Sequence, residues 1–150
     1  MRRLIPLLLL SAAACAGAQA PEATPAPAFY AAPDSALRTL PFSEAVAADG
    51  FLFLSGQIGV VPGTLSVVPG GLEAEATQAL ENIKGVLERH GSSLDKVVKC
   101  TVFMADMKEW PDFNVVYRRF FTAPYPARSA VGSNGLALGA RVEVECIAAR

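Results

Sequence analysis

The last strand-like segment of the chain, residues 141–148, alternates between two kinds of side chain. The odd-numbered side chains are mostly charged and lie on one side of an extended strand: Arg141, Glu143, Glu145 and Ile147. The even-numbered side chains are apolar and lie on the other side: Val142, Val144, Cys146 and Ala148. Such a strand packs its apolar side on a core and presents its charged side to water, a ligand or another subunit. The segment therefore predicts a sheet with one covered face and one open face.

Two segments with a helical period can form helices that cover the apolar face of this sheet. Apolar residues recur every three or four positions between residues 72 and 87, and Gly91 is placed to end that helix. A second helix is expected from about Trp110 or Pro111 to Phe121, with Pro111 in its first turn. Residues 97–105, between the two helices, form a β-branched run that indicates a strand.

Further strands are expected on both sides of this unit. Residues 51–54 form a short apolar run, and residues 41–46 a weaker strand before it, with a hairpin signal at Asp49-Gly50. Another strand, from about residue 128 to 132, precedes the final one. The resulting order β-β-α-β-α-β-β predicts an α+β domain with a mixed sheet and two helices packed on one face.

The N-terminus has the pattern of an export signal. Arg2 and Arg3 precede an apolar run that is shorter than the ~20 residues of a spanning helix, and small residues at 16–18 fit a cleavage site. We therefore expect a signal peptide over 1–18, a flexible Pro/Ala-rich linker over 19–39 and one domain over 40–150, which places the protein in the periplasm or outside the cell.

Three cysteines leave alternatives open. Lipid attachment at Cys15 would make the protein a lipoprotein, an alternative to plain cleavage after Ala18. Cys100 and Cys146 each fall within a strand-like run, and nothing in their spacing shows that they meet, so we expect two buried free thiols. With a single histidine, His90, and no cysteine pair at ligand spacing, we expect no metal site.

The charge balance argues against a nucleic-acid partner. The chain has 13 Lys+Arg against 14 Asp+Glu, with no basic stripe to neutralise phosphates. No segment is long enough to predict a membrane span.

Arg128 and Glu143 are the first candidate site. If the last two strands form an antiparallel hairpin, the turn would place Arg128 opposite or diagonal to Glu143. Arg128 could then grip a carboxylate through two parallel hydrogen bonds while Glu143 deprotonates a water. The spacing fits equally a cross-strand ion pair that only stabilises the hairpin. The two interpretations stay open on spacing alone.

The turn at Ser55-Gly56 is the second candidate site. A strand that ends in glycine can present backbone N–H groups to an anion. Ser55 itself is a poor nucleophile candidate, because no G-x-S-x-G motif surrounds it. His90 lies at the end of a helix and is expected to interact with the helix terminus rather than with a substrate.

Six blocks, the last made of two segments, resemble in the same order motifs of the RidA/YjgF/YER057c/UK114 family. They are Pro41–Val46, Phe53–Ile58 (F-L-S-G-Q-I), Gln78–Lys84, Val97–Phe103, Asn114–Tyr117 (N-V-V-Y), and Pro126–Ser129 (P-A-R-S) together with Val142–Glu145. The resemblance covers essentially residues 40–150. It implies a chorismate-mutase-like α+β fold and a homotrimer around a central barrel, with ligand clefts between neighbouring subunits.

The resemblance also implies an activity. Family members hydrolyse reactive 2-imino or enamine acids to 2-keto acids and ammonia without a cofactor. In this chain Arg128 would bind the substrate carboxylate and Glu143 would activate the attacking water. Ser55, Gly56 and Asn114 would shape the cleft.

Two positions depart from the family pattern, and other functions remain open. Phe42 stands where family deaminases commonly have Tyr, so a phenolic hydrogen bond near the ligand is lost, and Ala130 stands where they often have Cys. A trimer that binds small carboxylates without catalysis, or a chaperone-like interaction protein, would fit the same fold. The ribonuclease activity described for some relatives fits the acidic composition poorly.

Overall fold

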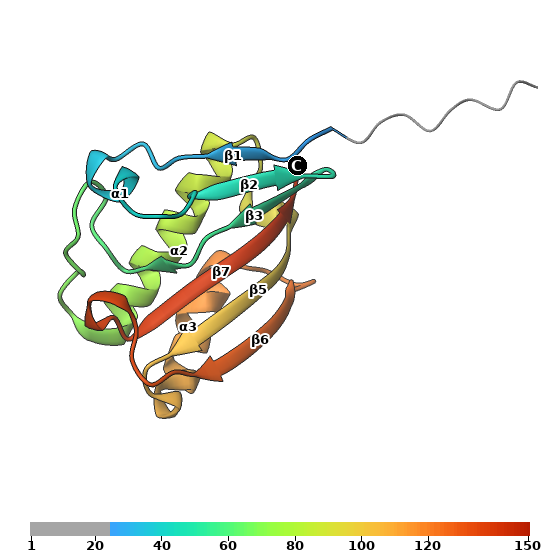
Figure 1. Ribbon diagram of the computed structural model, residues 1–150. Coiled ribbons are helices and arrows are strands. Elements are labelled where there is room, and N and C mark those ends of the chain that lie inside the picture. The colour runs from blue at the N-terminus through green and yellow to red at the C-terminus, as the bar shows by residue number, and fades with distance from the viewer. Residues whose placement is uncertain (1–24) are drawn as a thin grey trace, which may run out of the picture.

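The computed structural model describes residues 25–150, with only the backbone for residues 35 and 36, and contains one seven-stranded mixed sheet (Figure 1). Its strand order is β1-β2-β3-β7-β5-β6, and the short β4 pairs with β7. The strands are β1 (Ala28–Tyr30), β2 (Ala45–Ala48), β3 (Phe51–Leu54), β4 (Gln57–Ile58), β5 (Val97–Met104), β6 (Ala127–Gly132) and β7 (Val142–Ala149). The helices are α1 (Ser35–Arg38), α2 (Gly71–Arg89) and α3 (Trp110–Phe120).

Helices α2 and α3 pack on one face of the sheet, as predicted (Figure 1). Their apolar sides and the even-numbered side chains of β7 form one core, in which Leu80, Ile83 and Phe113 are fully buried. Helix α2 ends where expected, because Gly91 takes a φ of +78° and the Ser92 N–H donates to the carbonyl of Leu87 at 2.9 Å. The predicted α+β class and helix positions are confirmed.

The opposite face of the sheet is not covered by any element of residues 25–150. Burial along β7 alternates residue by residue, with the predicted apolar positions buried and the charged positions half-buried. The neighbouring strand β3 places two aromatic rings on the same open face: Phe51 is 40% exposed and Phe53 is 43% exposed. An open sheet face with large exposed apolar side chains is typical of a surface that another subunit covers.

The last two strands do not form a hairpin, so that prediction is wrong. Strand β6 pairs with β5, in parallel, while β7 lies between β3 and β5. Arg128 is therefore aligned with Cys100, and Glu143 is aligned with Phe103. The chain between β6 and β7 crosses over β5 because a central position buries the long apolar side of β7 better than an edge would.

Cys100 and Cys146 form a disulfide, which corrects the expectation of two free thiols. Because β7 pairs with β5, the two cysteines stand directly opposite each other, and both are buried in the core. Local sequence shows that each cysteine lies in a strand, whereas their contact depends on which strands pair.

The N-terminal part of the described chain differs from the expected linker over 19–39. Strand β1 pairs antiparallel with β2 and extends the sheet. The ring of Tyr30 stacks on His90 with 4.2 Å between ring centroids, which anchors this strand. The predicted signal peptide and the alternative at Cys15 lie outside the described residues. Within residues 25–150, no helix is both long and apolar enough to cross a membrane.

Candidate functional site

Arg128 lies in an aromatic slot on the helix-covered side of the sheet. Trp110, Asn114 and Tyr117 are spaced by four and three residues, so they project from the same side of α3. The guanidinium carbon of Arg128 lies 4.4 Å from the ring centroid of Trp110 and 4.3 Å from that of Tyr117. Its Nη2 donates to Oδ1 of Asn114 at 2.6 Å. Helix α3 therefore fixes the plane and the direction of the guanidinium.

Two donors in this slot have no hydrogen-bond partner in the described part of the chain. They are Nη1 of Arg128 and the hydroxyl of Tyr117, and both are buried. Burial lowers the pKa of Arg128 from its ordinary value, but an arginine stays charged at neutral pH. Burial raises the pKa of Tyr117 to about 12, so its hydroxyl stays protonated and can donate. A buried cation beside an unpaired donor calls for an acceptor such as a carboxylate.

Glu143 lies on the other face of the sheet, where β4 pairs with β7. Ile58 is its partner in the register, and Gly56 stands just before β4. A Cβ at Gly56 would overlap the Glu143 carboxylate, so only glycine lets this side chain lie against the backbone. Burial raises the pKa of Glu143, and the like charge of Glu145 raises it further. A carboxylate with a raised pKa suits proton transfer near neutral pH.

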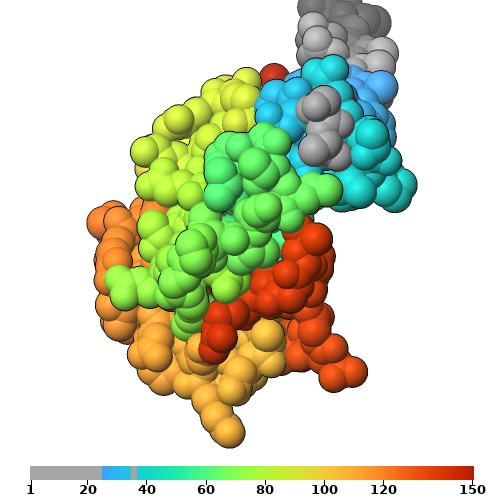
Figure 2. All heavy atoms as spheres, turned by 90° about the vertical axis from the view of Figure 1, so that its left-hand side faces the viewer, coloured from blue at the N-terminus to red at the C-terminus, as the bar shows by residue number. Residues whose placement is uncertain are grey.

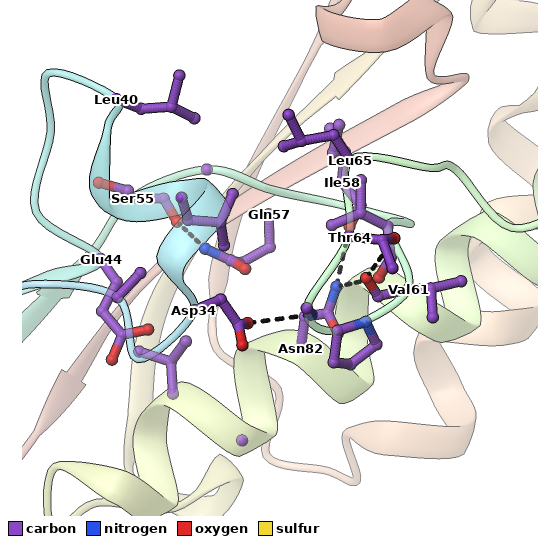
Figure 3. Close-up of a pocket in the computed structure, with 18 of the residues that line it drawn as sticks. Asp34, Leu40, Glu44, Ser55, Gln57, Ile58, Val61, Thr64, Leu65 and Asn82 are labelled. Atoms are coloured by element: carbon purple, nitrogen blue, oxygen red, sulfur yellow. Dashed lines mark hydrogen bonds between the residues drawn. The ribbon is translucent and has the colours of Figure 1, made fainter.

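Figure 3 shows a cavity whose walls include Ser55, Gln57 and Asn82. Its volume is about 620 Å³, and Glu143 is one of the residues that line it. The predicted site residues Phe42, Ser55 and Gly56 line it together with Glu143. Its outer wall is the loop over residues 59–70, which in Figure 2 lies between the N-terminal segment and the chain that leads into β7. Four of the six predicted site residues therefore meet here.

Arg128 and Glu143 do not meet within one chain. Arg128 is aligned across the sheet with Cys146, which is three residues from Glu143 on β7. An odd separation places two side chains on opposite faces of a sheet, and three residues span about 10 Å along a strand. The chain therefore carries two half-sites: the Arg128 half-site with Trp110, Asn114 and Tyr117, and the Glu143 half-site with Phe42, Ser55 and Gly56.

The remaining predicted residues have specific partners. The Ser55 hydroxyl donates to the carbonyl of Ser43 at 2.6 Å, which uses it structurally. Asn114 holds Arg128 rather than lining the cavity. His90 contacts Glu44, with 2.7 Å between Nε2 and Oε1. Residues 25–150 contain no group of three or more His, Cys, Asp or Glu side chains that could hold a metal ion.

Trp110 and Tyr117 were not predicted as parts of the site, although both lie on the predicted second helix. Their spacing around Asn114 could have indicated this role, since residues three and four apart lie on the same side of a helix and can contact the same side chain. Assigning them to Arg128 needed the parallel pairing of β6 with β5, which brings α3 over Arg128.

Comparisons with known proteins relate this chain to one family. Residues 32–150 match the family described as Endoribonuclease L-PSP. The chain is 43% identical over 108 residues to the bovine protein named 2-iminobutanoate/2-iminopropanoate deaminase, a match that covers 72% of this chain and 79% of the relative. It is 44% identical over 108 residues to the yeast protein HMF1, with 72% and 83% covered.

Solved structures show the same fold. A Rid-family protein from Yersinia pestis, YyfA, superposes with a TM-score of 0.77 at 34% identity and covers 83% of this chain and 100% of its own. TdcF from Escherichia coli, solved with bound serine, has a TM-score of 0.69 at 35% identity and covers 73% and 88%. With this sequence identity, coverage and fold, the chain belongs to the RidA/YjgF/UK114 family.

Proposed function

We propose that this protein hydrolyses 2-imino acids, or the enamines that interconvert with them, to 2-keto acids and ammonia. The observation that carries the proposal is the pair of complementary half-sites. Arg128 has a buried donor without a partner, and the Glu143 carboxylate accepts no hydrogen bond within residues 25–150. Relatives named 2-iminobutanoate/2-iminopropanoate deaminase, from cattle, mouse and human, support the same activity.

The reaction needs one carboxylate anchor and one group that moves protons. Arg128 binds the substrate carboxylate, and α3 holds its guanidinium plane in place. Glu143 takes a proton from a water whose oxygen forms a bond to the imine carbon. The protonated Glu143 gives this proton to the nitrogen, which leaves a carbinolamine with a hydroxyl and an amino group on the same carbon. Glu143 then takes the hydroxyl proton and passes it to the amino group while the carbon–nitrogen bond breaks and the carbonyl forms, so that ammonia leaves with the keto acid. No electrons are transferred to or from the substrate, so the proposed reaction needs no redox cofactor.

A complete site needs a second copy of the chain, and we infer a homotrimer with its open sheet faces around a central barrel. Support comes from the exposed rings on that face, Phe29, Phe51 and Phe53, and from the position of the two half-sites on opposite faces of one sheet. In a closed ring each interface is formed by two different surfaces. Arg128 of one subunit and Glu143 of its neighbour would then face the same cleft.

Binding of small carboxylates without turnover is the second candidate. The relative TdcF, solved with bound serine, favours it, since serine is a small molecule with a carboxylate. Arg128 would serve both functions, whereas only catalysis requires Glu143. A chaperone-like function would require neither residue.

We also propose that the protein is exported, as a periplasmic or secreted protein or, alternatively, as a lipoprotein through Cys15. The disulfide between Cys100 and Cys146 supports an oxidising compartment, since cytosolic thiols are kept reduced. Fractionation of cells that express the full chain tests this. Recovery of unprocessed protein from the cytosol with reduced cysteines would contradict it.

An oxidase-coupled assay tests the function. An amino-acid oxidase generates imino acids in situ, and semicarbazide traps those that survive. Wild type should accelerate imine loss over the protein-free control, and both Arg128→Ala and Glu143→Gln should abolish the acceleration. Wild type that matches the control while serine still binds would favour the carboxylate-binding candidate. Absence of both would overturn the whole assignment.

A further inference from the structure

We propose that the cavity beside Glu143 receives the substrate side chain and selects 2-imino acids with large apolar side chains, such as those formed from leucine or phenylalanine. This inference rests on the proposed deaminase function and names its substrate class. The relatives' names specify iminobutanoate and iminopropanoate, whose side chains are only an ethyl and a methyl group.

The size of the cavity is the first observation. Its volume of about 620 Å³ lies within the range of pockets that enclose drug-sized ligands and far exceeds what an ethyl group fills. Its walls come from several elements: the segment before β2, the 59–70 loop, α2 and the chain before β7. Most of the lining is apolar and includes Leu37, Ile58, Val60, Leu65, Val86 and Leu138.

Most polar groups of the wall bond to the protein itself. The Asp34 carboxylate accepts from the Gly63 N–H at 3.1 Å, which ties the N-terminal segment to the loop (Figure 3). The Asn82 amide donates to the carbonyls of Ile58 and Val60 at 3.1 and 3.0 Å (Figure 3).

Glu44 and Gln57 follow the same pattern. Glu44 accepts from Arg89 at 2.8 Å, and the Gln57 amide donates to the Ser55 carbonyl at 3.2 Å. These groups offer a ligand little further hydrogen bonding, so the surface left to it is apolar. An apolar cavity of this kind favours an aliphatic or aromatic group.

Charge sets the direction in which a substrate enters. Two lining carboxylates, those of Glu143 and the exposed Glu81, have no hydrogen-bond partner within the described residues. They repel the substrate carboxylate, which therefore points away from the cavity, towards Arg128 of the neighbouring subunit. The imine carbon then lies at Glu143 and the side chain extends into the cavity.

Gly85 on α2 allows a direct test. It lines the cavity, and a Cβ built there would meet only the end of the Arg89 side chain, at 3.3 Å. The position is regular helix, where leucine is favoured over glycine. Gly85→Leu should therefore fill part of the cavity without straining the fold. Glu88→Leu is the matched control, since Glu88 is exposed on the same helix and does not line the cavity.

The experiment measures kcat/KM for imino acids generated from alanine, 2-aminobutyrate, leucine and phenylalanine, from competition with semicarbazide. Wild type should prefer the leucine and phenylalanine products over the alanine product by at least tenfold. Gly85→Leu should lower the leucine-to-alanine ratio at least tenfold, and Glu88→Leu should leave it unchanged. Thermal unfolding of each variant checks that the fold is intact.

The outcomes separate this inference from the function on which it rests. Turnover that is fastest with the alanine product, or a ratio that Gly85→Leu does not change, overturns the side-chain assignment and leaves the deaminase standing. No acceleration with any of the four substrates overturns the deaminase itself.

Discussion

Arg128 and Glu143 carry opposite charges, and they differ in how firmly their surroundings hold them. The guanidinium lies between the rings of Trp110 and Tyr117 and is hydrogen-bonded to Asn114, so little freedom is left to it. The Glu143 carboxylate rests against the backbone at Gly56 and borders an open cavity without a hydrogen-bond partner in residues 25–150. The difference fits a division of tasks, because an anchor for a carboxylate gains from rigidity and a proton carrier must reach two atoms in turn.

The largest effect is expected at Arg128. Arg128→Ala removes the anchor, and Arg128→Lys keeps the charge but loses both the planar fork and the stacking between two rings. We expect kcat/KM to fall about a hundredfold or more in both variants. Steady-state kinetics of wild type and both variants with the same imino acid measures this fall in kcat/KM. Near-normal activity of Arg128→Lys would show that a point charge suffices and that the aromatic slot has no part in binding.

The disulfide joins β5 to β7, and so links the strand beside Arg128 to the strand that carries Glu143. The double variant Cys100→Ala/Cys146→Ala should lower the free energy of unfolding by about 2–4 kcal/mol. Urea unfolding of the variant and of wild type, each with and without reductant, measures this. Reductant should weaken only wild type. Equal stability of the two proteins under non-reducing conditions would contradict the prediction.

The pH dependence distinguishes the two half-sites, since Arg128 stays charged over the whole accessible range. Burial raises the pKa of Glu143, so this base is protonated, and activity lost, at a higher pH than an ordinary glutamate would give. The midpoint of activity, corrected for spontaneous hydrolysis, should lie above the ordinary value of 4.5.

Glu145→Gln sharpens that measurement. It removes the like charge that contributes to the raised pKa of Glu143, so the midpoint should move to lower pH. A midpoint at or below 4.5 in wild type, or a shift to higher pH in the variant, would contradict the assignment of Glu143 as the base.

The smallest effect is expected at Tyr117. Its buried hydroxyl has no partner within the described chain, so Tyr117→Phe loses no internal hydrogen bond and keeps the ring against Arg128. The free energy of unfolding should rise by about 1 kcal/mol. If the hydroxyl also donates to the substrate carboxylate, KM rises while kcat changes little. A clear loss of stability would show that the hydroxyl has a structural partner.

Local patterns were enough to predict much of this fold. Three predicted features depend only on neighbours in sequence, and each was confirmed. They are the helical spacing of apolar residues over 72–87, the glycine that ends α2 and the alternation of apolar and charged residues along β7. The resemblance to the family named six residues for one site, and the structure places four of them, Phe42, Ser55, Gly56 and Glu143, around one cavity. Arg128 and Asn114 lie apart from it.

Strand pairing could not be predicted, and the errors about the last two strands and the two cysteines follow from it. Placing β7 beside β6 made Arg128 and Glu143 neighbours and kept Cys100 apart from Cys146, whereas the observed order does the reverse. The N-terminal strand was missed for a related reason. Its three residues include only two large side chains, Phe29 and Tyr30, and become a strand by pairing with β2.

The central claim is that two subunits complete one site, and mixed oligomers of two inactive variants test it most directly. Arg128→Ala and Glu143→Gln are unfolded together, refolded at equal amounts and assayed. In a ring whose interfaces each take Arg128 from one subunit and Glu143 from the next, about a quarter of the sites regain both residues, and a similar share of activity should return. No activity above that of the separate variants would contradict a site shared between subunits.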